Sequence, residues 1–570
     1  MFGKLAPWIV LFVLAGVLIG LNGISPFYFI DDAYISFRYA ENLAEGHGLV
    51  FNPGERVEGY STTTLVLLLA LIHLFGVKIP IGALFVGLFF HAATVAMLLA
   101  FLRRFLTDKW YRPLPLFALL FTALHPTGVA YAESGMETSL ASFLLLLTLY
   151  LAGAAVEKGR SAGLAAAAAV GTFLLALTRP EMLALAAPIG LYLLLGNKEG
   201  RWPRAIAFGA VFAVAYGSFL LWRHWYFGDW QPNTYYAKAA GVGWRMMPAG
   251  LRYFAVYLIG ALFPFALLAL LALQGLLRTR MPGWWWCLLG VAVVQIGSVI
   301  WVGGDHFPLS RFFVPITPVL LLVLAQGWRE ARQALNRRFA TMAQTSLIVA
   351  GYLSCGALLL ASLATAMFYH NDGITFIREG RMALSWCDLG KNLARLYPPD
   401  TTVGLIPIGA IGYCSKLPIV DFVGLTDREI ARTPTDLTKS MPGHGRYNNR
   451  YVLKTKKPKL ILVQIRQFSM PLPEWAIRKA THLATVDLLR NKFFNADYAF
   501  HRLVLPNGYF HYWSRRDFED PSVNPGTYPV EGAHCPVPAV EPVRINAAGV
   551  MGADAAGNKD FKVPKGWEVW

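Results

Sequence analysis

The feature that most constrains the fold of this chain is a series of long apolar segments that recurs through its first two thirds. Each segment approaches the roughly 20 apolar residues that an α-helix needs to cross a bilayer. Of the 570 residues, 55% are hydrophobic and 15% are charged, and the mean hydropathy is +0.45. Because soluble domains carry about 25% charged residues, this composition predicts a polytopic membrane protein. The segments lie at 7–24, 81–102, 113–130, 138–156, 163–178, 182–196, 205–222, 252–277, 283–302, 312–327 and 343–368.

The loops between these segments indicate how the chain is oriented in the membrane. The formal net charge is +17. We interpret it as a topology signal rather than a nucleic-acid-binding surface, because Lys and Arg are enriched in cytoplasmic loops. If all the basic loops are cytoplasmic, residues 25–80 stay outside, and the short apolar run 62–77 is a juxtamembrane helix. This topology has eleven crossings, a cytoplasmic N-terminus and an extracytoplasmic C-terminal region. The basic loops are 103–112, 158–160, 198–204, 278–280 and 329–338.

The chain changes character after residue 368. Apolar runs shorten, and Pro, Asn and charged residues become more frequent. Short strands are predicted at 402–407, 417–422 and 459–464, with a helical turn at 410–415. The sequence therefore predicts an α-helical polytopic domain followed by a periplasmic domain of mixed α/β structure. The two domains are expected at 1–368 and 369–570.

Three of the five cysteines, Cys387, Cys414 and Cys535, lie in the C-terminal region. Outside the cytoplasm these three thiols permit one disulfide. The sequence does not determine which pair forms, and closeness along the chain favours Cys387 with Cys414. Cys287 and Cys355 lie in apolar runs and are expected to be inert core residues. The sequence shows no Cys/His spacing of a metal site.

Two adjacent carboxylates, Asp31 and Asp32, follow the first apolar segment at the predicted edge of the membrane. Carboxylates in this position are costly to desolvate, so we expect a functional role such as proton abstraction or metal binding. Two neighbouring aspartates alone make a thin ligand set for a metal. We therefore assign no metal ligands and no certain cofactor, and we leave a divalent cation open.

The predicted outer loops bring further polar residues to the membrane face that holds the two aspartates. Cationic side chains there suit a phosphate or pyrophosphate leaving group. Carboxylates suit the deprotonation of an attacking hydroxyl, and long apolar helices suit a lipid carrier. For Trp225, Trp230 and Tyr235 an interfacial aromatic belt is the simpler interpretation. The chemistry that combines all three features is transfer of a sugar from a polyprenyl phosphate to an acceptor outside the cytoplasm.

The motif that begins at Asp31-Asp32-Ala33-Tyr34-Ile35 and runs to Glu58 resembles the GT-C superfamily of polyprenyl-phosphate-dependent glycosyltransferases. Its full length is similar to the bacterial arabinofuranosyltransferase branch, which includes the terminal arabinofuranosyltransferases B of mycobacteria and a related pilin arabinosyltransferase. The strings 134–138, 232–238 and 303–306 also resemble that branch. The Lys-rich and Tyr-rich outer domain departs from the actinobacterial pattern.

The resemblance implies a GT-C fold of about 11 transmembrane helices plus the juxtamembrane helix, with the site on the periplasmic side of a bacterial inner membrane. The donor would be a polyprenyl-phosphate-linked sugar, D-arabinofuranose, and the acceptor a glycan or a pilin-type glycoprotein. Asp31 and Asp32 are the catalytic candidates, and the sequence does not choose between them. Candidates for the donor phosphate and sugar are Arg38, Arg179, Arg223, Lys238, His306 and Arg311. Candidates for acceptor or sugar hydroxyls are Glu58, Tyr60, Glu137, Asn233, Tyr236 and Asp305.

Other functional classes remain alternatives at this point. One is a GT-C enzyme of the mannose or aminoarabinose type, and another is a flippase for lipid-linked sugars. Transporters usually hold acidic residues near the bilayer midplane on broken helices, whereas here they gather at one face. A third is a membrane anchor that displays the C-terminal domain, which would need neither many spans nor polar loops. We expect that domain to help dock the acceptor glycan.

Overall fold

The computed structural model describes most of the chain in two compact units, which divide within one helix at Leu384 and Ser385. The sequence places the division earlier, at 368 and 369. The described residues are 29–106, 113–157, 161–238, 243–259, 281–338, 353, 356–357, 372–435, 445–505 and 508–523.

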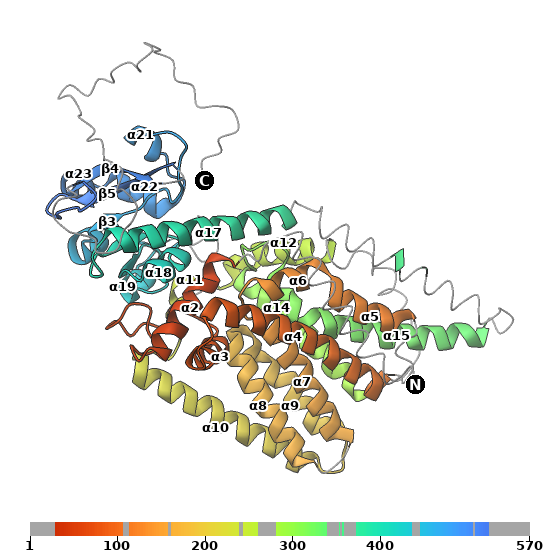
Figure 1. The fold of residues 1–570 in the computed structure, drawn as a ribbon. Coiled ribbons are helices and arrows are strands. Elements are labelled where there is room, and N and C mark those ends of the chain that lie inside the picture. Colours follow the sequence, from red (N-terminus) through yellow and green to blue (C-terminus); the bar gives the residue numbers. More distant parts are fainter. Residues whose placement is uncertain are drawn as a thin grey trace. The chain divides into compact units, whose positions relative to one another are not determined.

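Unit 1 is built of helices (Figure 1). The first two, α2 (Asp31–Ala44) and α3 (Thr63–Leu74), pack against each other. The remaining elements are α4 (Ile79–Phe101), η1 (Leu102–Leu106), α5 (Pro113–Leu124), α6 (Pro126–Glu133), α7 (Thr138–Glu157), α8 (Ala162–Thr178), η2 (Pro180–Leu185), α9 (Ala186–Leu195), α10 (Arg201–Phe227), α11 (Asn233–Lys238), η3 (Gly243–Met246), α12 (Met247–Tyr257), α14 (Gly283–Val302), η6 (Arg311–Ile316) and α15 (Thr317–Arg338).

Unit 1 contains helical segments that are long and apolar enough to cross a membrane. Within the described residues there are five, and the shorter apolar helices 63–74, 162–178, 180–195 and 311–327 accompany them. The chain is therefore a multi-pass membrane protein, as its composition predicts. The predicted segments 7–24 and 343–368 lie wholly or almost wholly outside the described residues, and so does most of 252–277, from residue 260 on. The count of eleven crossings therefore stays a prediction. The five segments are 79–106, 113–133, 138–157, 201–227 and 283–302.

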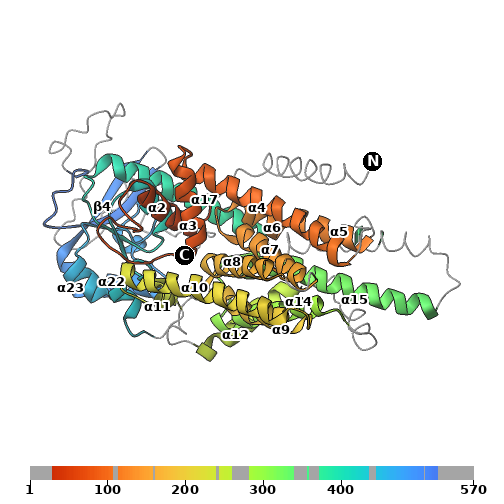
Figure 2. The same cartoon turned by 90° about the horizontal axis from the view of Figure 1, so that it is seen from below.

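Small residues set how closely the helices of the bundle approach one another. A Cβ at Gly87 of α4 would lie 2.0 Å from the carbonyl oxygen of Ala132, and one at Gly171 of α8 would lie 2.4 Å from Thr148 Oγ1 of α7. Such contacts are open only to glycine, as in other closely packed membrane helices. The result is a bundle in which α7 is largely buried and α10 runs along the outside, beside α8 (Figure 2).

The short run 62–77 forms α3, a helix of 12 residues. At 1.5 Å per residue it is about 18 Å long, which is too short to cross the roughly 30 Å hydrocarbon core. It buries Leu65 and Leu69 within unit 1 and exposes Leu67 and Leu71 on its opposite face. The predicted short helix is thus confirmed, and its apolar exposed face suits a juxtamembrane position.

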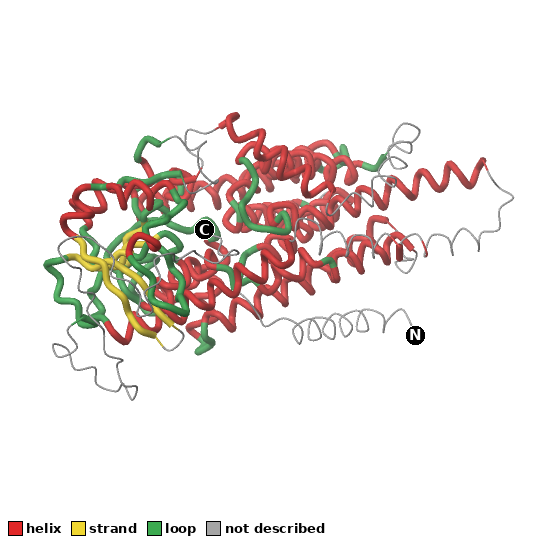
Figure 3. The backbone as a smooth tube through the Cα atoms, turned by 90° about the horizontal axis from the view of Figure 1, so that it is seen from above, coloured by secondary structure: helices red, strands yellow, loops and turns green. Residues whose placement is uncertain are grey.

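Unit 2 contains a five-stranded sheet of order β2-β1-β3-β5-β4, drawn in yellow in Figure 3. The strands β1 (Val403–Leu405), β2 (Ile419–Asp421) and β3 (Leu460–Ile461) pair in parallel, and β4 (Tyr498–Leu505) and β5 (Gly508–Arg515) form an antiparallel hairpin joined to β3. The helices of this region are α17 (Asp372–Leu396), α18 (Gly409–Ser415), α19 (Arg428–Arg432), α20 (Asn449–Tyr451), η9 (Val452–Lys456), α21 (Glu474–Ile477), α22 (Leu483–Arg490) and α23 (Lys492–Asp497).

The mixed α/β character of the C-terminal region is confirmed. All three predicted strands are present, each shorter than expected, and the helical turn is α18. Phe422, Ile461, Phe494 and Trp513 belong to the apolar core of the unit. The hairpin β4–β5 was not predicted from the sequence, because His501 and Arg502 interrupt the alternation of apolar and polar residues in β4.

A disulfide joins Cys387 of α17 to Cys414 of α18, with a Cα–Cα distance of 5.2 Å. This is the pair that closeness in sequence favours, so the expectation is confirmed. Cys287 is buried in α14 with a free thiol, as expected of a core residue. Cys355 and Cys535 lie outside the described residues.

Removing the disulfide is expected to destabilise unit 2 selectively. Replacing both Cys387 and Cys414 with Ala should lower the free energy of unfolding of unit 2 by about 3–4 kcal/mol, because the bond closes a loop of 27 residues and restricts the unfolded chain. Hydrogen exchange of the strand amides in residues 403–421 of the full-length protein measures this. Cys287→Ala is the control, and equal protection in both proteins would contradict the expectation.

Asp421 ends β2 with its carboxylate buried in unit 2. The carboxylate accepts hydrogen bonds from the backbone N–H groups of Val423 (2.9 Å) and Thr426 (3.0 Å). Burial raises the pKa of Asp421 to about 6, although the backbone donors oppose the shift. Because the folded state then holds the proton more tightly than the unfolded state, the stability contribution is present below about pH 4 and is lost as the pH rises through about 6.

The free energy of unfolding of unit 2 should therefore decrease as the pH rises from 4 to 7, and deprotonation of Asp421 should account for the decrease. We expect a decrease on the order of 2–3 kcal/mol between pH 4 and pH 7 that is absent in Asp421→Asn. Hydrogen exchange of full-length protein at a series of pH values, corrected for the intrinsic exchange rate, measures it. Equal pH dependence in the variant and the parent protein would show that another group is responsible.

Candidate active site

Asp31 and Asp32 form the first turn of α2, where carboxylates interact favourably with the positive end of the helix dipole. The start of α2 is held against the segment that precedes α7, since the Ile30 N–H donates to the Ser134 carbonyl at 3.4 Å. Gly135 adopts φ +75°, and a Cβ there would lie 2.8 Å from the Phe37 ring. The glycine therefore lets α2 approach closely enough to place the acidic pair beside this segment.

The next turns of α2 hold the loop between α2 and α3, residues 45–62, in place. The Arg38 guanidinium donates from Nε to the Phe51 carbonyl at 2.6 Å and lies over the Phe51 ring at 4.5 Å. Asn42 donates to the carbonyls of Val50 and Phe51 at 2.8 and 3.0 Å, and Tyr39 donates to the Val57 carbonyl at 2.6 Å. These contacts give Arg38 a structural role, and they do not favour its predicted role at the donor phosphate.

The end of the same loop is tied to α10 by a buried ion pair. Arg223 Nε lies 2.8 Å from Glu58 Oε2, and Nη2 donates to Glu58 Oε1 at 3.1 Å. Burial raises the pKa of Glu58 to about 7, and the positive charge of Arg223 opposes the rise. The Asn233 N–H at the start of α11 donates to the Glu58 carbonyl at 2.9 Å, and Tyr60 is buried with its ring centroid 4.6 Å from that of Tyr39. The structure thus groups four predicted residues, Glu58, Tyr60, Arg223 and Asn233.

A second group of charges surrounds Arg179, which lies between α8 and η2. Its Nη1 is 2.6 Å from Glu137 Oε1, and its Nε is 2.6 Å from Glu181 Oε1. All three side chains are largely buried. The guanidinium also lies 4.2 Å from the centre of the Phe312 ring. Glu181 was not assigned a role from the sequence, although it stands two positions after Arg179.

The loop before η6 adds Asp305 and His306, and η6 itself begins with Arg311. Arg311 Nε lies 2.7 Å from Asp305 Oδ2, and His306 Nδ1 lies 3.4 Å from Asp305 Oδ1. Burial of Asp305 favours its neutral form, but the positive charges of Arg311 and its neighbours outweigh burial and lower the pKa of that carboxyl. Arg311 also lies 5.3 Å from the Phe312 ring, so Phe312 contacts the guanidinium groups of both Arg179 and Arg311.

Asp32 interacts electrostatically with the cluster formed by Asp305, His306 and Arg311. Burial lowers the pKa of His306, and the negative charges of Asp305 and Asp32 oppose that effect. Arg311 likewise interacts with Asp32, and Lys238 at the end of α11 interacts with Asp305 and His306. The structure therefore brings together one catalytic candidate and most of the predicted cationic residues.

Two further residues belong to this region of unit 1. Glu379 of α17 has a pKa raised by burial, an effect that Asp32 strengthens and Arg378 opposes. Glu379 was not among the candidates predicted from the sequence, because it lies far along the chain from the predicted outer loops. Tyr236 of α11 is half-buried, with its ring centroid 5.6 Å from that of Tyr235. Its predicted role toward a hydroxyl group stays a prediction.

The arrangement offers three functions in one place. A carboxylate at a helix start can accept a proton. Buried guanidinium groups can bind an anion, and carboxylates already paired to those groups hold them in position. Asp32 and its cationic neighbours were all candidates from the sequence, whereas the pairing of each charge is visible only in the folded chain.

Known proteins resemble this chain in two ways: one family matches its C-terminal region, and several individual proteins match a larger part of the chain. A family described as a domain of unknown function (DUF8728) matches residues 375–520. The terminal β-(1→2)-arabinofuranosyltransferase of Corynebacterium glutamicum is 28% identical over 363 residues, which cover 55% of this chain and 51% of that protein. The match thus spans about half the length of this curated relative.

Two solved structures share the fold. ArnT from Cupriavidus metallidurans, bound to undecaprenyl phosphate, matches with a TM-score of 0.50 and 14% identity over 73% of this chain and 85% of its own. The oligosaccharyltransferase AglB from Archaeoglobus fulgidus, in complex with an inhibitory peptide and a dolichol-phosphate, matches with a TM-score of 0.50 and 10% identity. This match covers 91% of this chain and 75% of the AglB chain. The chain therefore has the fold of the GT-C glycosyltransferases and resembles their bacterial arabinofuranosyltransferase branch.

Proposed function

We propose that this chain is a membrane glycosyltransferase that uses a polyprenyl-phosphate-linked sugar. The sugar is D-arabinofuranose, and the acceptor is a glycan or glycoprotein on the periplasmic side of a bacterial inner membrane. The observation that carries the proposal is the position of Asp32 at the start of α2, within the electrostatic reach of His306 and Arg311. A base beside an anion-binding cluster is what transfer from a sugar phosphate requires.

In this proposal Asp32 is the catalytic base. The acceptor hydroxyl oxygen attacks the anomeric carbon of the donor, and its proton passes to the Asp32 carboxylate. The bond from the anomeric carbon to the phosphate oxygen breaks, and polyprenyl phosphate leaves with the electron pair. Negative charge develops on that oxygen during the step, so cationic groups close to it lower the barrier.

Arg311 and His306, assisted by Lys238, are our candidates for the group that stabilises the phosphate. Arg311 is buried and paired to Asp305, so its guanidinium is held in place before the donor arrives. A guanidinium group that is already oriented costs no free energy of reorientation when charge develops on the phosphate oxygen. Arg179 supports the same cluster through Phe312, and its own charge is balanced by Glu137 and Glu181.

The choice of arabinofuranose rests on the sequence rather than on the shape of the site. The curated relative carries that activity in its name and is 28% identical, while the structural neighbours share only the fold. The ArnT and AglB structures contain undecaprenyl phosphate and a dolichol-phosphate. A lipid phosphate of this kind, joined to the sugar, is the donor that we propose for this chain.

Mass spectrometry of lipids that copurify with the full-length protein tests the donor. We expect a polyprenyl phosphate or its glycoside, with the mass of a pentose on the glycoside. A hexose or an aminopentose instead would keep the enzyme class and replace the sugar. Recovery of ordinary phospholipids alone, together with no binding of added polyprenyl phosphate, would contradict the proposed donor class.

A further inference from the structure

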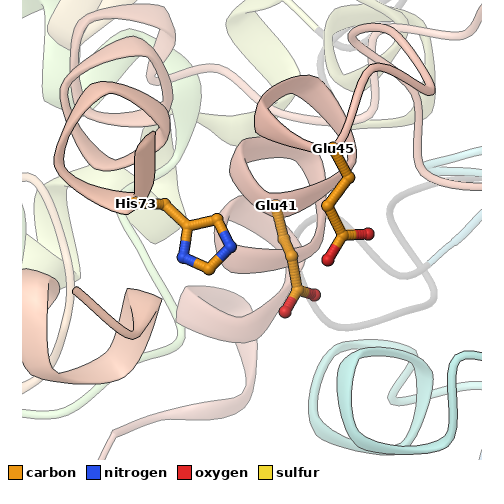
Figure 4. Close-up of side chains that lie close together, drawn as sticks. All are labelled: Glu41, Glu45 and His73. Atoms are coloured by element: carbon orange, nitrogen blue, oxygen red, sulfur yellow. The ribbon is translucent and has the colours of Figure 1, made fainter. Parts of the chain in front are cut away.

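Away from the acidic pair, α2 and α3 bring three potential metal ligands together: Glu41, Glu45 and His73 (Figure 4). One ligand atom from each side chain lies within 4.8 Å of the others. Glu41 stands in the last turn of α2, Glu45 is the residue that caps the C-terminal end of α2, and His73 stands in the last turn of α3. Glu45 is exposed, and the other two side chains are half-buried.

The two glutamates are placed where an α-helix disfavours them. They stand four residues apart, so their like charges face each other along the helix. They also lie at the C-terminal end of α2, where the helix dipole favours cations, and the last turn of α2 holds no basic residue. His47 lies close to this pair, with Nδ1 at 3.7 Å from Glu45 Oε2, and both side chains are about half exposed. A bound cation would offset both unfavourable effects.

The hydrogen bond of His73 sets which ring nitrogen can bind a metal. His73 Nδ1 lies 3.0 Å from the Val77 carbonyl oxygen. A carbonyl can only accept, so Nδ1 carries the hydrogen, and Nε2 of the neutral ring bears the lone pair. Metal-binding histidines usually donate their other N–H to a carbonyl or carboxylate in this way, which fixes the ring and raises its basicity. In Figure 4 the imidazole ring of α3 is turned toward the Glu41 side chain of α2.

The ligand types indicate the metal. One imidazole and two carboxylates suit a divalent transition cation such as Zn²⁺, with a water molecule completing a tetrahedron. Bonds of about 2.0–2.2 Å in a tetrahedron separate the ligand atoms by about 3.4 Å. The atoms now lie up to 4.8 Å apart, and rotation of the two glutamate side chains can close that difference.

We propose that Glu41, Glu45 and His73 form a binding site for Zn²⁺ or a similar divalent cation, which joins α2 to α3. The site lies roughly 14 Å along α2 from Asp32, at 1.5 Å per residue, so it is distinct from the candidate active site. Its role is to fix the helix that carries the acidic pair against the apolar helix α3. The inference goes beyond the proposed sugar transfer and does not depend on it.

Metal titration of the full-length protein tests this site. The protein is purified in detergent without a polyhistidine tag, stripped with a chelator and titrated with Co²⁺ alone, whose visible absorption reports tetrahedral coordination. We expect one Co²⁺ per chain, displacement by Zn²⁺, and a rise in Tm of about 2–4 °C when Zn²⁺ saturates the site. Absence of the Co²⁺ band, or of any Tm shift with Zn²⁺, would overturn the proposal.

Variants assign the binding to these residues. His73→Asn keeps an N–H group close to the Val77 carbonyl and removes Nε2, so the helix end is preserved. We expect His73→Asn and Glu41→Gln each to weaken Co²⁺ binding at least tenfold, since loss of an outer partner of a ligand alone costs roughly 10–100-fold. His47→Asn is the matched control and should bind as the parent does. Unchanged Co²⁺ affinity in a folded His73→Asn protein would refute the site.

Discussion

Replacing Asp32 with Asn is expected to lower the rate of sugar transfer by about 10²–10⁴-fold, the usual effect of losing a general base. The substitution keeps the size of the side chain and its place at the start of α2, so the fold should persist. It removes the group that would accept the proton of the acceptor hydroxyl. The rate of glycoside formation from a lipid-linked donor, measured in detergent or in liposomes, reports the effect.

Asp31→Asn is the matched control for this experiment. Both aspartates stand in the first turn of α2, but successive residues point about 100° apart around a helix. Asp32 interacts electrostatically with His306 and Arg311, and it is the base that we propose, so we expect a smaller loss in Asp31→Asn. A larger loss in Asp31→Asn would exchange the two roles. Full activity in both variants would remove the acidic pair from the mechanism.

Replacing Arg311 with Met is expected to lower the free energy of unfolding by about 3–5 kcal/mol, because it removes the nearest ion-pair partner of the buried Asp305 carboxylate. The same change should abolish most sugar transfer, since the cationic group proposed for the donor phosphate is lost. Thermal unfolding in detergent measures the first effect, and the transfer rate measures the second.

A double variant separates the structural role of Arg311 from its functional role. Asp305→Asn combined with Arg311→Met removes both charges, so much of the stability should return, while sugar transfer should stay low. Arg104→Met is the control for a pair of nearly the same length in a more exposed setting, because Arg104 lies 2.8 Å from Glu157 and such a pair contributes at most about 1 kcal/mol. Recovery of both stability and transfer in the double variant would make Arg311 a structural residue only.

The sequence predicted those features of the fold that depend on composition and local pattern. The length of the apolar segments predicted the membrane helices, and the short apolar run at 62–77 predicted α3. Three short strands were found because each is an apolar run bounded by turn residues. The hairpin β4–β5 was missed, since its pairing depends on partners that a single strand pattern does not contain.

Most residues of the candidate site could be predicted from the sequence, but the side chains that each of them contacts could not. Asp32, His306 and Arg311 were all expected at one face, and the structure places them within electrostatic reach of one another. The contacts of Arg38 with the Phe51 carbonyl could not be read from the sequence, because the direction of a side chain depends on how α2 packs. Glu379 was missed for a similar reason, as it reaches this region through a helix far along the chain.

The most direct test of the account is a transfer assay with the purified protein in liposomes. The assay supplies polyprenyl-phosphoryl arabinofuranose with a labelled sugar, together with a soluble arabinan or glycopeptide acceptor. The account predicts a labelled glycoside on the acceptor and an equal amount of released polyprenyl phosphate, and both should fall in Asp32→Asn. Movement of the labelled lipid across the bilayer without any glycoside would contradict the account and indicate a flippase.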